Sequence, residues 1–315
     1  MLPILILCFV RLDSLKECID SILSQEHGPI YISCDAPPYE FLSQGAEVQK
    51  YIKFLLASGV VKEIRISESN QGILRGVTSG VSWFFERVEK GIILEDDLIL
   101  QPNFLKSVEL ASKHLDHPKV IALGLHNSVP NEFISNQQAI LRSSWFVISW
   151  GWVTTKDNWN SRIKTYQEVD YLKLLLNMLP KIGLSSTLYH MYYYRKKLAT
   201  ERTNIVKCTW ADLWQINAFL KNSIVLTYNK NFVHNIGFDQ FATNTKSNNT
   251  EYALEALSEV DFDDKKYHSK IQQVDQSADR YFAKNRKIST IVRGRIQIRT
   301  RMKEFRRRGN LKSRI

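Results

Sequence analysis

Three consecutive acidic residues follow a short apolar run about a third of the way along the sequence. The apolar run covers 92–94, and the acidic residues are Glu95, Asp96 and Asp97. Adjacent carboxylates repel one another and need a compensating cation. Mg²⁺ and Mn²⁺ prefer oxygen ligands, and proteins usually bind them through one or two carboxylates plus the phosphates of a substrate. The triplet therefore predicts a divalent-metal site, with a solvated acidic turn as the alternative.

A second candidate carboxylate stands between two tryptophans in the run Trp210-Ala211-Asp212-Leu213-Trp214. Apolar neighbours raise the pKa of a carboxylate and make it a better general base. The alternative is an aspartate that caps a helix beside tryptophans of the core. The residues alone leave both interpretations of Asp212 open.

The elements that would position these carboxylates alternate over the first 125 residues. Short apolar strands are predicted at 3–10, 29–34, 60–66, 92–94 and 120–123, and amphipathic helices at 13–24, 46–57, 72–88 and after Pro102. Asp13 is expected to cap the first helix. Buried strands with helical crossovers predict an α/β fold with a single doubly wound, mostly parallel sheet. Ligands bind such sheets outside the carboxyl ends of the strands, where the triplet falls.

This alternation ends near residue 125. Loops and short strands are expected over 126–160, helices over 167–197 and 211–220, and a strand over 223–227. Four tyrosines, Tyr189, Tyr192, Tyr193 and Tyr194, span little more than one helical turn and cannot all face one way. The exposed members of this group are candidates for contact with an acceptor.

The positive charge of the chain belongs to its last 32 residues. The whole chain has a net charge of +11, and residues 284–315 hold 13 Lys/Arg against one Glu, with apolar residues between them. A basic segment with interleaved apolar residues favours an anionic membrane surface. A disordered solubilising tail is the alternative. Nucleic acid is not the expected partner, because the rest of the chain is nearly neutral and lacks a basic binding surface.

The first apolar run, at 2–10, is read as a buried strand. Its nine residues fall short of the roughly 20 that a spanning helix needs. No basic region precedes them, as a signal peptide would require. The four cysteines show no CxxC spacing, so neither a zinc site nor a disulfide framework is indicated. We therefore expect a cytoplasmic protein.

Several motifs in order make the sequence resemble the GT-A glycosyltransferases. Within that family it looks most like the N-acetylglucosaminyltransferase that initiates complex N-glycans and like bacterial enzymes of surface-polysaccharide synthesis. The motifs lie between residues 3 and 245 and are Leu7-Cys8-Phe9-Val10-Arg11, Ile32-Ser33-Cys34-Asp35, Glu95-Asp96-Asp97-Leu98, Trp150-Gly151-Trp152, the Asp212 segment and Asn231-Phe232-Val233-His234-Asn235-Ile236-Gly237-Phe238-Asp239.

The resemblance implies a role for each matched residue on the donor side. Cys8 and Arg11 would line the nucleotide, with Arg11 against the base. Asp35 would recognise uracil, whose imide N–H suits an acceptor carboxylate. Asp97 would bind Mn²⁺ or Mg²⁺ directly.

The other matched residues would contact the sugars. Glu95 and Asp96 would bind sugar or ribose hydroxyls of the donor. The segment Trp150, Gly151 and Trp152 would lie beneath the donor sugar. Asp212 would be the catalytic base, although many relatives have Trp-Asp where this chain has Trp-Ala-Asp.

The implied function is an inverting hexosyl- or N-acetylhexosaminyl-transferase with a UDP-sugar donor and a divalent metal. Its acceptor would be a glycan hydroxyl of lipopolysaccharide, capsule or another surface polysaccharide. A lipid-linked acceptor at the inner face of the membrane would fit the basic tail. The GT-A domain would cover 1–245, with a donor half at 1–125 and an acceptor half at 126–245. A polar extension would follow at 246–283, and the tail at 284–315.

Two alternatives stay open. A nucleotidyltransferase also uses metal-binding carboxylates on such a sheet, but it would want a basic, glycine-rich phosphate loop, which residues 8–13 lack. A non-enzymatic nucleic-acid-binding protein acting through the tail is the other.

Overall fold

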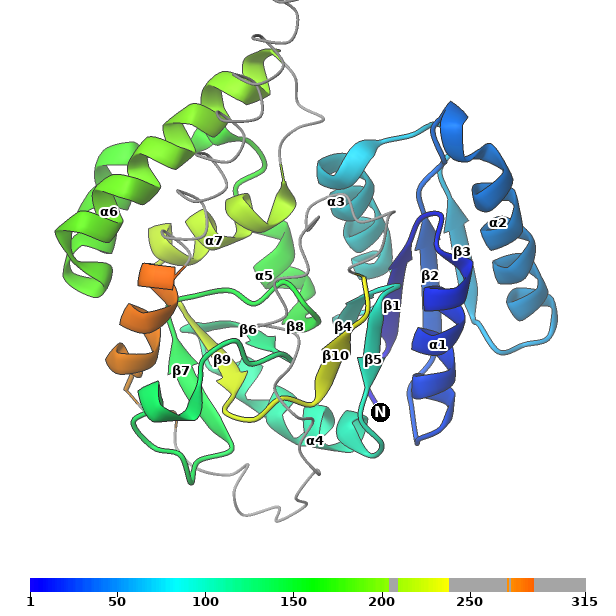
Figure 1. Cartoon of the computed structure of the whole chain (residues 1–315), viewed down its shortest axis with the longest axis horizontal. Coiled ribbons are helices and arrows are strands. Elements are labelled where there is room, and N and C mark those ends of the chain that lie inside the picture. Colours follow the sequence, from blue (N-terminus) through cyan, green and yellow to red (C-terminus); the bar gives the residue numbers. More distant parts are fainter. Residues whose placement is uncertain (204–208, 238–270, 272, 286–315) are drawn as a thin grey trace, which may run out of the picture.

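The computed structural model describes residues 1–203, 209–237, 271 and 273–285. Its centre is one eight-stranded sheet in the order β3-β2-β1-β4-β8-β6-β9-β7, and a separate two-stranded sheet pairs β5 with β10 (Figure 1). The strands are β1 (Ile4–Cys8), β2 (Ile30–Cys34), β3 (Glu63–Ile66), β4 (Lys90–Glu95), β5 (Leu98–Leu100), β6 (Val120–Gly124), β7 (Leu141–Ser144), β8 (Trp152–Thr155), β9 (Ile224–Tyr228) and β10 (Val233–Asn235).

Helices cover both faces of the large sheet (Figure 1). The α-helices are α1 (Leu12–Leu23), α2 (Leu42–Ala57), α3 (Gly72–Phe85), α4 (Phe104–Ala111), α5 (Lys156–Asn160), α6 (Tyr171–Thr203) and α7 (Trp210–Leu220). Short 3₁₀ helices are η1 (Tyr39–Phe41), η2 (Ser112–Asp116), η3 (Asn131–Phe133) and η4 (Tyr166–Glu168). The expected α/β class with a central, mostly parallel sheet is confirmed, and the pair β5 and β10 forms a second, small sheet beside it.

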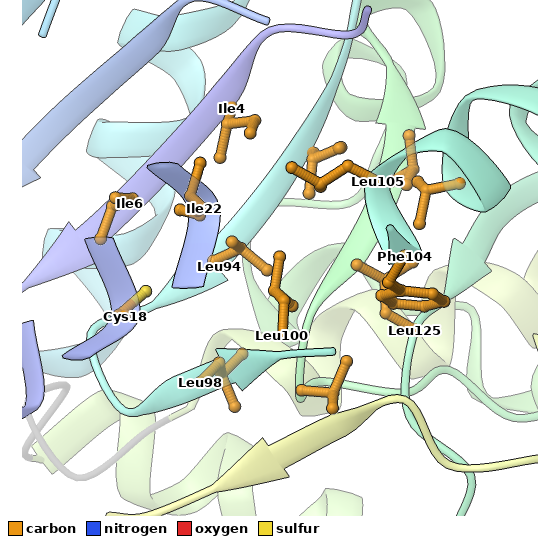
Figure 2. Packing of buried hydrophobic residues seen from close by; sticks show 14 of the residues in the cluster. Ile4, Ile6, Cys18, Ile22, Leu94, Leu98, Leu100, Phe104, Leu105 and Leu125 are labelled. Atoms are coloured by element: carbon orange, nitrogen blue, oxygen red, sulfur yellow. The ribbon is translucent and has the colours of Figure 1, made fainter. Parts of the chain in front are cut away.

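The two cores follow from the period-2 alternation of the strands. In β1, Ile4 and Ile6 point into a cluster with α1, α2 and α4, whereas Leu5 and Leu7 point into a cluster with α3 and α7. Figure 2 shows the first cluster, in which Leu98 and Leu100 of β5 pack beside Phe104 of α4. Because both faces of β1 are covered, all five of its residues are buried, which explains its continuous apolar sequence.

Parallel pairing brings the ends of three strands to one edge of the sheet. Strand β1 pairs in parallel with β2 on one side and with β4 on the other. The register sets Cys8 opposite Cys34, and Leu7 opposite Glu95. The loop after β1, Asp35 and the acidic triplet therefore leave the sheet at the same edge, as the sequence predicted. Strand β8 enters antiparallel between β4 and β6 and divides the sheet into two parts.

Four local features differ from the sequence-based expectations. Asp13 does not cap α1, because the helix already begins at Leu12, and Asp13 lies in its first turn. There its charge still interacts favourably with the helix dipole. Strands β5 and β10 were not expected, and neither was a helix at 276–285. Helix α6 extends to Thr203 and is broken at Gly183, whose φ is 74°.

The segment 273–285 packs back onto the sheet edge at β7. Val274 bridges to Ser143, and Asp275 accepts hydrogen bonds from the backbone and hydroxyl of Ser135. Asp279 accepts a 2.6 Å bond from Ser144 Oγ. These contacts attach the segment to the expected acceptor half.

Within the described part of the chain, no helix combines the length and apolarity needed to cross a membrane.

Candidate active site

The acidic triplet begins on the last residue of β4 and turns directly into β5. Glu95 closes β4, and the backbone N–H of Asp96 donates to Leu7 O across the strand ends. The side chains of Asp96 and Asp97 are buried, with residue exposures of 2% and 5%. A solvated acidic turn is therefore excluded as a description of the triplet.

Arg11 supplies the cation that the triplet needs. Its Nη2 lies 2.5 Å from Asp96 Oδ1 and 2.8 Å from Asp97 Oδ2. The backbone N–H of Phe9 donates a further bond to Asp96 Oδ2 at 3.2 Å. Burial opposes the charge on Arg11, but the two carboxylates outweigh it and raise the pKa of the guanidinium. The guanidinium is thus engaged by the triplet, and contact of Arg11 with a nucleotide base stays a prediction.

One oxygen of Asp97 has no hydrogen-bond partner among the described residues. Asp97 Oδ1 is buried and accepts nothing, whereas Oδ2 is used by Arg11. A buried carboxylate oxygen left unpaired is costly, and it suits a hard divalent cation. No three His, Cys, Asp or Glu residues of the described chain form a metal-binding group. A metal at Asp97 would therefore need further oxygens from a ligand such as a diphosphate.

Burial and mutual repulsion shift the other two carboxyl groups of the triplet. Burial, with the nearby Asp97 and Asp96, raises the pKa of Glu95 to about 8. Burial likewise raises the pKa of Asp96 to about 6, although Arg11 opposes the shift. The triplet therefore holds a proton at neutral pH, and an added cation would favour its release.

Gly237 covers the triplet from the segment after β10. The backbone N–H of Ile236 donates to Asp97 O at 2.9 Å, and that of Gly237 donates to Asn235 Oδ1 at 2.8 Å. A Cβ on Gly237 would collide with Asp97 Oδ2 and with Arg11 Nη1. Any side chain at this position would have to displace the ends of the Asp97 and Arg11 side chains. Residues Phe238 and Asp239 of the same matched segment lie outside the described residues.

We expect Gly237→Ala to destabilise the protein by about 1–3 kcal/mol, because the Asp97 carboxylate must move to admit the methyl group. Chemical denaturation of the metal-free protein measures this cost. The matched control is Gly59→Ala, where a Cβ meets no atom within 4 Å but φ is +77°. The control costs about 1 kcal/mol from backbone strain alone. A Gly237→Ala variant as stable as the native protein would show that the contact is not tight.

Asp35 has a structural role that the sequence did not indicate. Its carboxylate accepts hydrogen bonds from the backbone N–H groups of Gln71 and Gly72, at 3.0 and 3.1 Å, and from Ala36. These bonds satisfy the first turn of α3. Burial raises the pKa of Asp35 while the backbone donors oppose that shift. Recognition of uracil by Asp35 stays a prediction.

The segment Trp150, Gly151 and Trp152 runs beside the triplet strand. Trp152 pairs with Ile93 of β4, and Gly151 adopts a φ of +74° against Leu94 and Leu125. The Trp152 side chain is buried in the core, but Trp150 is only half-buried, edge-on to His126 at 4.7 Å. Trp150 is therefore the more accessible of the two tryptophans.

Cys8, which was expected to line the nucleotide, is buried opposite Cys34 in the sheet.

Asp212 lies in the first turn of α7 and is buried, with 2% exposure. Its Oδ2 accepts hydrogen bonds from Tyr193 Oη at 3.0 Å and from Tyr166 Oη at 3.4 Å. Thr209 is the N-cap residue, since its Oγ1 accepts from Ala211 N. The alternative that Asp212 caps the helix is therefore wrong.

Stacked tryptophans join the Asp212 helix to the triplet strand. Trp210 of α7 stacks on Trp152 of β8, with ring centroids 5.3 Å apart and an interplanar angle of 25°. Trp159 and Trp214 complete the cluster. Since β8 pairs with β4, this packing fixes α7 relative to the triplet.

Two tyrosines at Asp212 come from separate parts of the sequence. Tyr193 belongs to the predicted cluster, whose members do face different ways: Tyr194 is fully buried and Tyr192 is 69% exposed. Tyr166, in η4, carried no signal in the sequence. A lone tyrosine 46 residues before its partner aspartate has no local pattern that would identify it.

Comparison with known proteins gives distant likenesses in fold only. No protein-family model and no curated protein matches the sequence. Among solved structures, residues 1–349 of S. aureus TarS are 10% identical, with a TM-score of 0.42 over 74% of this chain and 60% of that one. GalNAc-T7 with UDP, GalNAc and Mn²⁺ is 10% identical, with a TM-score of 0.42 over 73% of this chain and 43% of that one.

A mannosyltransferase from Pyrobaculum calidifontis, in complex with GDP-Man and Mn²⁺, is 11% identical. Its TM-score is 0.35, over 69% of each chain. A second structure of S. aureus TarS has a longer chain than the 1–349 structure, and this chain covers 36% of it. Likenesses this distant do not indicate what the present chain binds.

Proposed function

We propose that this chain is a glycosyltransferase that binds a nucleotide-sugar donor and a divalent metal at the acidic triplet. The observation that carries the proposal is the buried, unpaired Oδ1 of Asp97 at the carboxyl ends of β1, β2 and β4. Parallel strand ends are the usual ligand site of such sheets.

Asp97 would hold the metal, Mn²⁺ or Mg²⁺, together with oxygens of the donor diphosphate. The metal, when bound, neutralises charge that develops on the leaving diphosphate. Arg11 keeps the metal-free triplet charge-balanced through its contacts with Asp96 and Asp97. Glu95 and Asp96 would orient the donor through its hydroxyls, and Trp150 offers an accessible ring for a sugar.

Asp212 would act as the general base of an inverting transfer. The acceptor hydroxyl oxygen forms a bond to the anomeric carbon while the bond from that carbon to the diphosphate breaks. The acceptor proton goes to the Asp212 carboxylate. Tyr193 and Tyr166 both donate to Oδ2, which fixes the orientation of that carboxylate.

The more specific parts of the proposed function rest on the sequence. UDP is favoured as the donor nucleotide through Asp35. The transferred group would be a hexosyl or N-acetylhexosaminyl residue, and the acceptor a glycan of a surface polysaccharide. A cytoplasmic location at the inner face of the membrane, with the basic tail on anionic lipid, belongs to the same proposal.

Metal binding at pH 7 is expected to release up to about one proton, because the Glu95 carboxyl, with a pKa near 8, must ionise beside the cation. Titration calorimetry with Mn²⁺ in two buffers of different ionisation enthalpy measures this release. The difference between the buffers should shrink several-fold at pH 9, where a carboxyl with a pKa near 8 is about nine-tenths ionised. Equal enthalpies in both buffers at pH 7 would contradict the prediction.

A panel of nucleotide-sugars tests the function itself. Binding and slow hydrolysis of each donor are measured with Mn²⁺ and with a chelator. A glycosyltransferase should bind and hydrolyse one class of donor in a metal-dependent way, with UDP-sugars expected. Turnover of a sugar phosphate with a nucleoside triphosphate would point to a nucleotidyltransferase. Binding of no nucleotide-sugar would refute the proposal.

A further inference from the structure

Helix α6 presents apolar side chains to solvent on both sides of its break. The helix is interrupted at Gly183 (φ 74°, ψ 164°), which leaves two helical halves. Six large apolar residues of α6 are exposed: Leu172, Leu176 and Leu179 in the first half, and Leu184, Leu188 and Tyr192 in the second. The exposed fraction is 67% at Leu172, 61% at Leu184 and 69% at Tyr192.

The spacing of these residues defines one outward face on each half. Steps of four and three residues in the first half, and of four and four in the second, keep side chains on one side of a helix. The opposite side is anchored in the core through Leu174, Met178 and Ile182 in the first half and Tyr194 in the second. Helix α6 lies at the outer edge of the molecule, far from α2 (Figure 1).

The charges of α6 are almost all positive. Lys173, Arg195, Lys196 and Arg202 are exposed. Arg195 follows Tyr192 by three residues and continues the outward face of the second half. The acidic residue of the helix, Glu201, is buried and accepts a hydrogen bond from Tyr166 N at 3.0 Å. Within its own bounds, α6 therefore combines exposed leucines with cations and has no exposed carboxylate, while the exposed Asp170 lies immediately before its first residue.

We propose that α6 is a docking surface for an anionic lipid membrane. Exposed leucines beside basic residues are the composition of helices that lie in the plane of a membrane interface. The C-terminal tail and a second copy of this chain are poorer partners, because the tail is basic and a second α6 would also be cationic. The inference rests on the membrane location in the proposed function and deepens it, by adding a contact surface on α6. Hydrolysis of a soluble donor does not require a membrane and therefore tests the enzyme activity separately.

The surface on α6 would act together with the basic tail. A single weak membrane signal gives marginal, reversible binding, and stable attachment takes two. Residues 284–315 carry 13 Lys/Arg and supply electrostatic attraction, while α6 adds leucines that enter the interface. Loss of either should then strongly reduce binding of the full chain.

Co-sedimentation of the full chain with vesicles tests the proposal. Equimolar phosphatidylglycerol and phosphatidylcholine vesicles are compared with phosphatidylcholine alone. Leu184→Ser/Leu188→Ser, and separately Leu172→Ser/Leu176→Ser, report on each half of α6. The pair of substitutions in the half of α6 that inserts should lower the partition coefficient on anionic vesicles at least about tenfold. The control is Leu42→Ser/Phe54→Ser on α2, two comparably exposed apolar residues, which should change nothing.

A second readout detects insertion directly. A tryptophan placed by Leu188→Trp should be quenched by brominated acyl chains, whereas one placed by Leu42→Trp should not. Arg195→Glu/Lys196→Glu should weaken binding to anionic vesicles and lower its salt dependence. A chain that ends at Ala283 should also lose binding. Donor hydrolysis should be unchanged in the α6 variants, so that this test is independent of the proposed function.

Several outcomes would overturn the proposal. Unchanged partition in both leucine variants, with loss only on truncation at Ala283, would assign membrane binding to the tail alone. A dimer in solution that the leucine variants dissociate would make the face an interface between copies. Absence of vesicle binding by the native chain, with capture of an acidic protein through the same leucines, would assign the face to a protein partner.

Discussion

Asp97→Asn is expected to lower the affinity for Mn²⁺, and for a nucleotide-sugar in the presence of Mn²⁺, by about 100-fold or more. Asparagine keeps the shape of the side chain, so the buried packing of the triplet is retained. It removes the negative charge from the one carboxylate whose Oδ1 has no hydrogen-bond partner in the described structure. Titration calorimetry with Mn²⁺ and donor measures the change.

The matched control for this variant is Asp116→Asn. Asp116 is also an ion-paired aspartate, 2.8 Å from Lys90 Nζ, but its side chain is 73% exposed. Loss of an exposed pair costs at most about 1 kcal/mol of stability and should leave metal and donor binding unchanged. Native-like, metal-dependent donor binding by Asp97→Asn would remove Asp97 from the metal site.

Asp212→Asn should reduce the turnover of sugar transfer by about 10²–10⁴-fold, because a neutral amide cannot take the proton of the acceptor hydroxyl. Affinity for the donor should stay within about twofold of the native value, since the substitution leaves the triplet untouched. Single-turnover transfer and donor binding are measured on the same preparation. Asparagine can still accept hydrogen bonds from Tyr193 and Tyr166, so the fold should be retained.

Tyr193→Phe tests the orientation of the Asp212 carboxylate separately from its role as a base. This variant loses the 3.0 Å hydrogen bond to Asp212 Oδ2 but keeps the carboxylate. We expect a turnover decrease of about tenfold or less, well below that of Asp212→Asn. Near-normal transfer by Asp212→Asn would move the catalytic base to another residue.

The donor side of the fold is predictable because its strands are continuous apolar runs. The segment Ile4–Cys8 is buried on both faces and can only be an interior strand. Strand β4 likewise ends at a charged residue, Glu95, which marks the carboxyl end of the strand. Strands β5 and β10 have three residues each, too few to show a period. The helix at 276–285 is held in place by hydrogen bonds that Ser135 donates to Asp275 and Ser144 donates to Asp279, which no local pattern indicates.

The sequence indicated most of the candidate residues, with Tyr166 as an exception, but not the contacts between them. Repulsion within the triplet predicted a cation, yet only the fold identifies Arg11, 85 residues away, as the side chain that supplies it. Asp35 matched a donor-binding motif, and the structure adds that it caps α3, 36 residues later. Gly237 shields the triplet only because β10 pairs with β5. Such long-range contacts depend on strand pairing, not on residue type.

A crystal structure with UDP and Mn²⁺, with the anomalous signal of manganese recorded, tests the central claim most directly. We predict an anomalous peak at bonding distance from Asp97 Oδ1, shared with the diphosphate oxygens of UDP. An ordered UDP with no manganese at Asp97, or manganese bound only elsewhere on the protein, would contradict the assignment of the acidic triplet as the donor's metal site.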